Sequence, residues 1–219
     1  MTDICKKTDN RPFSKHIGAF FSLFLILSFS FLSNSCISIS SLFSKPAYKV
    51  SLSRKIMDPG FFTSVELADF FMSQNPDADR TEVDELAFYY VYEGLSEGIN
   101  YSVAFAQMCL ETGYLKFGNL VTKDMHNYCG LGSTDKDNPG ASFATMQFGV
   151  RAHIQHLQAY ATKEDQPLNN PVVDPRYDWP HKTKYITDIT GLAGNWATDP
   201  KYSEKIESIL CKMEDFYNN

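Results

Sequence analysis

Apolar residues return every three or four positions along most of the chain after residue 63, which is the spacing of one face of a helix. The first run follows Thr63 and Glu66, which have the spacing of a capping box, and it stops at Asn75-Pro76. No long period-2 pattern of a strand is seen, so the class is expected to be mainly α. The pattern predicts helices over about 64–74, 80–97, 146–162 and 200–216, with a short one over about 186–193.

A further run differs because seven of the eight residues 103–110 are apolar. A helix that is apolar nearly all round is a buried one, and Gly113 marks its end. Glu111, the only charged residue between Asn100 and Lys116, lies at its C-terminal end. Burial and the negative end of the helix dipole both disfavour a carboxylate, so we expect a raised pKa. A glycosidase needs such a protonated carboxyl, although a frayed helix end or a salt bridge to Lys116 would also explain the residue.

The N-terminal region has the order of a secretory signal, with four basic residues in 1–18 and then 11 apolar residues among the 14 of 19–32. The apolar run is short for a membrane-spanning helix, which needs about 20 residues. Cys36 follows in LSNSC, which resembles a loose bacterial lipoprotein cleavage box. A lipid anchor on Cys36, an uncleaved signal anchor and simple cleavage all stay open, and each exports the protein. We therefore divide the chain into a signal or anchor (1–36), a linker (37–62) and one domain (63–219).

Composition and charge exclude some classes of function. The apolar share of 43% and the charged share of 21% are those of a globular protein. The net charge is −6, with no run rich in Lys or Arg, so no nucleic-acid partner is expected. The five cysteines form no CxxC pair and no HExxH motif occurs, so we expect no metal; His153 and His156 are interpreted as packing residues.

Four sequence blocks occur in an order that resembles the glucosaminidase domain of bacterial peptidoglycan hydrolases, glycoside hydrolase family 73. The resemblance covers about residues 64–216 and implies a lysozyme-like helical fold with a cleft and a small β-hairpin lobe. It also implies cleavage, without metal or cofactor, of the β-1,4 bond after N-acetylglucosamine in the wall glycan. The blocks are AFAQMCLETGYLKFGN (104–119), NYCGLGS (127–133), GASFATMQFGVRAHIQHLQAYA (140–161) and GNWATDPKYSEKI (194–206).

The resemblance assigns roles residue by residue. Glu111 matches the general acid, and Asn127 and Gly130 match the N-x-x-G block that shapes the cleft floor. Trp196 and Tyr202 match the two aromatic positions of Y-A-T-D-P-x-Y. Trp196 replaces the usual first Tyr, so it can stack on a sugar but supplies no phenolic hydroxyl, a role that would then move to Tyr202. The resemblance also places the segment 174–177 beside the cleft, with Tyr177 as a substrate-binding residue.

A second catalytic carboxyl is harder to assign. Many family members have a second Glu in the hairpin lobe, but the only acids between Cys129 and Phe148 are Asp135 and Asp137. Asp135 on a loop could activate water, as inverting hydrolysis requires, or the N-acetyl group of the substrate could attack instead. Simple solvated turn residues would also fit. A Cys109–Cys129 disulfide stays open because pairing cannot be deduced from sequence.

The sequence thus predicts an exported endo-β-N-acetylglucosaminidase, anchored to a membrane at its N-terminus and acting on peptidoglycan strands. A lytic transglycosylase also uses a lone Glu in a lysozyme-like cleft and remains an alternative. The missing hairpin Glu and the Trp196 replacement leave a non-catalytic glycan-binding lipoprotein as a second alternative.

Overall fold

Helices account for the regular structure of residues 49–163 and 165–219, which are the residues that this computed structural model describes. The mainly α class is confirmed, and the four amphipathic helices begin and end within two residues of the predicted positions. The elements are α1 (Ser64–Gln74), α2 (Arg80–Glu97), α3 (Tyr101–Thr112), η2 (Lys123–Met125), α4 (Met146–Ala161), α5 (Asp178–Thr183), η3 (Ile189–Leu192) and α6 (Tyr202–Asn218).

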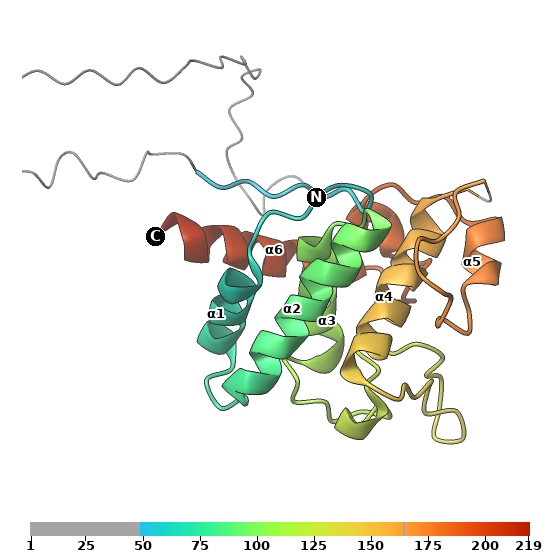
Figure 1. The fold of residues 1–219 in the computed structure, drawn as a ribbon, viewed down its shortest axis with the longest axis horizontal. Helices are drawn as coiled ribbons and strands as arrows, with labels where there is room; N and C mark the ends of the chain where they lie inside the picture. The colour runs from blue at the N-terminus through green and yellow to red at the C-terminus, as the bar shows by residue number, and fades with distance from the viewer. Residues whose placement is uncertain (1–48, 164) are drawn as a thin grey trace, which may run out of the picture. The chain divides into compact units, whose positions relative to one another are not determined.

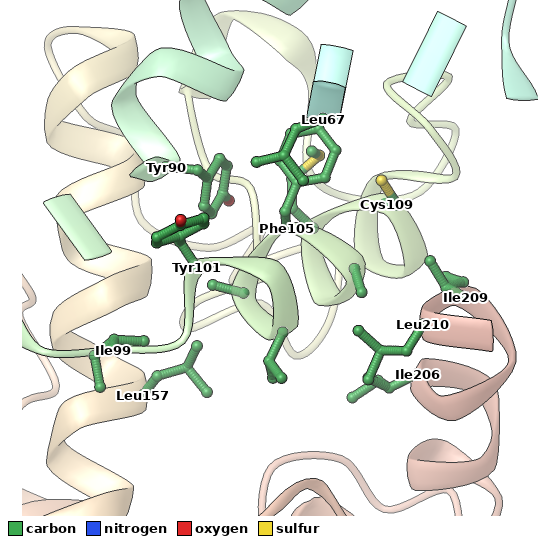
Figure 2. Close-up of a cluster of buried hydrophobic side chains, with 14 of the residues drawn as sticks. Leu67, Tyr90, Ile99, Tyr101, Phe105, Cys109, Leu157, Ile206, Ile209 and Leu210 are labelled. Atoms are coloured by element: carbon green, nitrogen blue, oxygen red, sulfur yellow. The ribbon is translucent and has the colours of Figure 1, made fainter. Parts of the chain in front are cut away.

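The apolar helix α3 is the centre of the packing. Ten of its 12 residues are buried, because α1, α2, α4 and α6 all contact it. Figure 1 shows α2 and α4 running side by side, and α2 also packs against α1. In Figure 2, side chains from the surrounding helices lie on several sides of α3, among them Leu67, Tyr90, Leu157 and Ile206. The most apolar run in the sequence therefore places Glu111 at the edge of the core.

Local signals explain where α1 and α3 begin. Thr63 and Glu66 form the predicted capping box, in which each side chain accepts a hydrogen bond from the other residue's backbone N–H. The Asn100 side chain caps α3 by accepting from the N–H groups of Ser102 and Val103. The same Asn100 amide donates to Ser53 and Lys55 carbonyls, so it also joins α3 to the segment before α1.

The second half of the expected linker is part of the packed unit, which includes residues 50–219. Leu52, Ile56 and Phe62 are buried in the main core. The Ile56 N–H donates to Thr187 O at 2.9 Å, and its carbonyl accepts from Asn100 N at 2.8 Å. The sequence pattern missed this segment because its buried residues follow neither helical nor strand periodicity.

The sequence pattern predicts no helix between residues 163 and 185, but the structure has α5 there. This helix has six residues with Pro180 in its first turn, a position where proline removes no helical hydrogen bond. The expected helix over 186–193 is only the short η3. The expected β-hairpin lobe is also absent from the described residues. Between residues 127 and 142 the chain has no strand, and an isolated bridge joins Asp135 and Asn138 across a tight turn.

Within residues 49–163 and 165–219, no helix is long and apolar enough to cross a bilayer. The apolar run 19–32 and Cys36 lie outside the described residues.

Candidate active site

A cleft of about 610 Å³ opens beside the C-terminal end of α3. This volume lies within the usual range for small-molecule and cofactor sites. One wall is formed by the loop that follows α3 and by the glycine-rich loop around residues 127–134, and the other by α4, the start of α5 and residues 195–198. Glu111 lines the cleft and is the only carboxyl among the described residues that do so.

The Glu111 carboxyl is half-buried, and its pKa is raised above the ordinary value. Burial, which penalises the charged form, is the largest cause. Hydrogen bonds from Tyr202 and Trp196 act in the opposite direction and are too weak to reverse the shift. The predicted direction of the shift is therefore confirmed.

Five side chains form a continuous series of hydrogen bonds that ends at Glu111, and we call it the buried row. The Tyr202 hydroxyl donates to Oε1 of Glu111. Gln107 Nε2 donates to the Tyr202 oxygen at 2.8 Å, and Gln107 Oε1 lies 3.0 Å from Nε2 of His153. The other His153 nitrogen, Nδ1, lies 2.8 Å from the Tyr90 hydroxyl. The row thus crosses the core from α2 to the cleft through α4, α3 and α6.

The floor of the cleft is a loop that Asn127 holds in shape. Its amide donates to the carbonyls of Leu131 and Ala141, both at 3.0 Å, and its Oδ1 accepts from Leu131 N at 2.9 Å. Gly130 lies in this loop with φ of 66°, and a methyl group added there would lie 3.6 Å from Oε2 of Glu111. Oε2 is therefore the oxygen of the acid that is nearer the cleft floor, and Asn127 shapes the floor while its own amide is fully used.

Trp196 joins the cleft wall to the acid. Its side chain hydrogen-bonds Glu111, and the indole N–H, its only donor, makes this contact. The Trp196 ring centroid lies 4.9 Å from that of His156 and 5.4 Å from that of Tyr160, and all three line the cleft. His156 is in turn fixed by Asp174, whose Oδ2 lies 2.7 Å from Nδ1.

The segment 174–177 borders the cleft through Arg176, whereas Tyr177 is buried beside it. The Tyr177 hydroxyl donates to Gln158 at 2.6 Å and its ring stacks on His181, so it is not among the cleft-lining side chains. Arg176 is exposed and lines the cleft together with Trp179. The resemblance places the segment 174–177, which contains Arg176, beside the cleft but singles out Tyr177 in it, and no sequence pattern indicates Trp179.

Asp135 lies on the exposed turn of the glycine-rich loop. Its Oδ1 accepts from the backbone N–H groups of Asp137 and Asn138 at 2.9 and 3.0 Å, and Oδ2 accepts from Thr134. Hydrogen bonding from Asn138 is the largest cause of a lowered Asp135 pKa. Thr134 lines the cleft and Asp135 does not, because the turn directs the carboxylate back onto its own backbone.

Two further expectations concern sulfur and metal. Cys109 and Cys129 are buried free thiols, so the disulfide left open between them is not formed. Burial raises the pKa of both thiols, which makes them poor nucleophiles. Across the described residues, no group of three or more His, Cys, Asp or Glu side chains could hold a metal ion.

Residues 88–215 match the family model named Glucosaminidase, described as mannosyl-glycoprotein endo-beta-N-acetylglucosaminidase. The chain is also 40% identical over 154 residues to an uncharacterized protein of Borreliella burgdorferi (strain ATCC 35210 / DSM 4680 / CIP 102532 / B31). That alignment covers 70% of this chain and 74% of the relative. No solved structure matches the chain.

Proposed function

The chain belongs to the glucosaminidase family, and from this premise we propose that it hydrolyses the β-1,4 bond after N-acetylglucosamine in peptidoglycan. The single observation that carries the proposal is the position of Glu111. A half-buried carboxyl with a raised pKa lines a cleft of suitable size and is held there by hydrogen bonds from two aromatic side chains. A glycosidic oxygen placed against this carboxyl can receive its proton.

In the first step, Glu111 gives its proton to the bridging oxygen as the bond from that oxygen to the anomeric carbon breaks. Positive charge then develops on the sugar ring, as in other glycoside hydrolyses. The Glu111 carboxylate that remains accepts hydrogen bonds from Tyr202 and Trp196, which stabilise the charge it has just gained. The site therefore supports both the acid and the carboxylate form of the same group.

We further propose that the substrate's own N-acetyl group supplies the nucleophile. Its carbonyl oxygen attacks the anomeric carbon and closes an oxazolinium ring, and Glu111 then takes a proton from the water that reopens it. The support is that Glu111 is the one carboxyl among the described cleft-lining residues, while Asp135 is held in a turn. Asp135 as a base that activates water remains the alternative.

A lone acid equally fits a lytic transglycosylase, in which the 6-hydroxyl of muramic acid takes the place of water. Mass spectrometry of fragments released from purified sacculi separates the two reactions. We expect fragments with a reducing-end N-acetylglucosamine. Anhydro-muramic ends would establish the transglycosylase, and tight binding to sacculi without any fragment at high protein concentration would establish a non-catalytic glycan-binding protein.

We also propose that the protein acts outside the cytoplasm, held at a membrane by its N-terminal region. The support is the basic-then-apolar order of residues 1–32 and the cleavage-box pattern at Cys36. Metabolic labelling with a radioactive or alkyne fatty acid tests the anchor, with Cys36→Ser as the control. Labelling that is lost in the variant supports a lipid anchor, and an unlabelled wild-type protein contradicts it.

A further inference from the structure

When Glu111 is ionised, the direction of hydrogen-bond donation along the buried row is fixed. A carboxylate can only accept hydrogen bonds, so the Tyr202 hydroxyl must donate to it. The Tyr202 oxygen then accepts from Gln107 Nε2, which leaves Gln107 Oε1 to accept from His153. His153 must consequently carry its proton on Nε2 and accept at Nδ1.

When Glu111 is protonated, the direction of donation is decided by Tyr90, at the other end of the row. Reversal of all the bonds would turn Nδ1 of His153 into a donor and Tyr90 into an acceptor. The Tyr90 hydroxyl proton would then have no acceptor, since His153 is its only hydrogen-bond partner in the described part of the chain. Tyr90 is fully buried, and an unpaired buried donor is strongly disfavoured. The original direction is therefore favoured in both states of the acid.

We propose that the three inner residues of the buried row keep the Tyr202 hydroxyl directed at Oε1 of Glu111 and so hold the acid proton on Oε2, the oxygen nearer the cleft floor. This inference rests on the proposed function, in which Glu111 is the general acid. The three act through Tyr202 and do not reach the substrate, so they are positioning residues. They are Gln107 on α3, His153 on α4 and Tyr90 on α2.

The described groups around the row carry no unpaired charge. Burial lowers the pKa of His153 to about 3, so the ring stays neutral over the working pH range. The titratable groups that face the row from the cleft loop and α3 are Cys129, Tyr128 and Cys109, and burial raises the pKa of each. His156, the remaining neighbour on α4, pairs with Asp174. Glu111 is thus the residue of the row whose charge changes, and the donors and acceptors of the other four must fit both of its states.

The first test observes the His153 tautomer in the full chain by ¹⁵N NMR of the imidazole nitrogens. We expect the proton on Nε2 and an unprotonated Nδ1 from pH 5 to pH 8. Tyr90→Phe removes the hydroxyl that fixes Nδ1. In this variant we expect a mixture of tautomers at low pH, where Glu111 is protonated, and the Nε2 tautomer at high pH, where the Glu111 carboxylate still fixes the row. Tyr114→Phe is the matched control, because the buried Tyr114 hydroxyl has no hydrogen-bond partner among the described residues. A wild-type ring protonated on Nδ1, or a Tyr90→Phe ring that keeps its proton on Nε2 alone where Glu111 is protonated, overturns the proposal.

The second test measures kcat/KM for glycan cleavage against pH in Gln107→Met. The variant keeps the size of the side chain but frees the Tyr202 oxygen to accept the Glu111 proton. We expect kcat/KM at the optimum to fall about tenfold, and its alkaline limb to move to higher pH. Gln158→Met is the control, because it removes a comparably buried amide of α4 that bonds Tyr177 and Thr162 instead.

The outcomes separate this inference from the proposed function. A fall in kcat/KM with an unmoved alkaline limb, equal to the fall in Gln158→Met, indicates a merely structural role and overturns the inference. If the wild-type protein cleaves no glycan, the proposed function fails and with it the role in catalysis. The NMR result still decides independently whether the row has the inferred direction.

Discussion

Tyr202 and Glu111 lie 91 positions apart in the sequence, yet the hydroxyl of one donates directly to the carboxyl of the other. The contact joins the first residue of α6 to the last turn of α3. It stabilises the charged form of Glu111, while burial of the same carboxyl favours the neutral form. The pKa of the acid therefore depends on a balance between α3, which buries it, and α6, which hydrogen-bonds it.

Replacement of Tyr202 by Phe removes the Tyr202 hydrogen bond to Glu111 but keeps the carboxyl buried. Because the lost hydrogen bond lowered the Glu111 pKa, the acid should stay protonated to higher pH. We predict that the alkaline limb of kcat/KM moves to higher pH in Tyr202→Phe, measured as glycan cleavage across a series of buffers. Tyr114→Phe should leave the limb in place, and a limb that moves downward in Tyr202→Phe would contradict the account.

The burial of His153 predicts an acid-sensitive fold. The pKa of His153 is about 3 in the folded protein, against an ordinary value of 6.5. As the pH falls, His153 therefore binds a proton in the unfolded chain before it does so in the folded protein. Stability is thus fully present above pH 6.5 and is lost as the pH falls towards 3. His153→Gln should reduce the slope of the free energy of unfolding against pH in this range by up to about 1.4 kcal/mol per pH unit. Urea unfolding at several pH values measures it, and an unchanged slope would show that His153 is not buried as a neutral ring.

Gly149 lets the loop before the cleft floor approach α4. A methyl group on Gly149 would overlap the carbonyl oxygen of His126, the residue before Asn127. We predict that Gly149→Ala destabilises the fold by about 1–3 kcal/mol, as overpacking does, and lowers glycan cleavage by displacing the cleft floor. Gly191→Ala is the comparison, since the atoms nearest its methyl group would belong to the Ile186 side chain and not to a backbone carbonyl. Equal melting temperatures and activities in the two variants would contradict this role for Gly149.

A substitution of Asp135 tests whether this residue is the second catalytic group. Because its carboxylate serves the exposed turn, we predict that Asp135→Asn keeps kcat/KM within about twofold of the wild type. Loss of a general base typically lowers the rate by about 10²–10⁴-fold. A loss of that size in sacculus digestion, with an unchanged melting temperature, would assign Asp135 as the base and exclude assistance by the substrate as the sole route.

Much of the helical framework was predictable because its signals are local. The capping box at Thr63 and the apolar runs fix each helix within a few neighbouring residues. Glu111 was predictable for a similar reason, since it is a lone charge at the end of the most apolar helix. The resemblance to a family added Tyr202 and Trp196, whose contacts with Glu111 local patterns could not supply.

The rest of the site depends on contacts between distant segments. His153 and Gln107 are 46 positions apart, and Gln107 and Tyr202 are 95 apart. No periodicity reveals that three such residues meet in the core. Trp179 lines the cleft from α5, a short helix that the sequence pattern does not reveal because it contains Pro180.

The most direct measurement is the rate of glycan cleavage by Glu111→Gln, compared with the wild type on the same purified sacculi. Glutamine keeps the shape of the side chain but cannot donate an acid proton. The account predicts a loss of at least about 100-fold in kcat/KM, the scale of general acid catalysis. It also predicts a melting temperature at neutral pH no lower than that of the wild type, because burial disfavours the carboxylate. A folded variant that releases fragments at the wild-type rate would contradict the account.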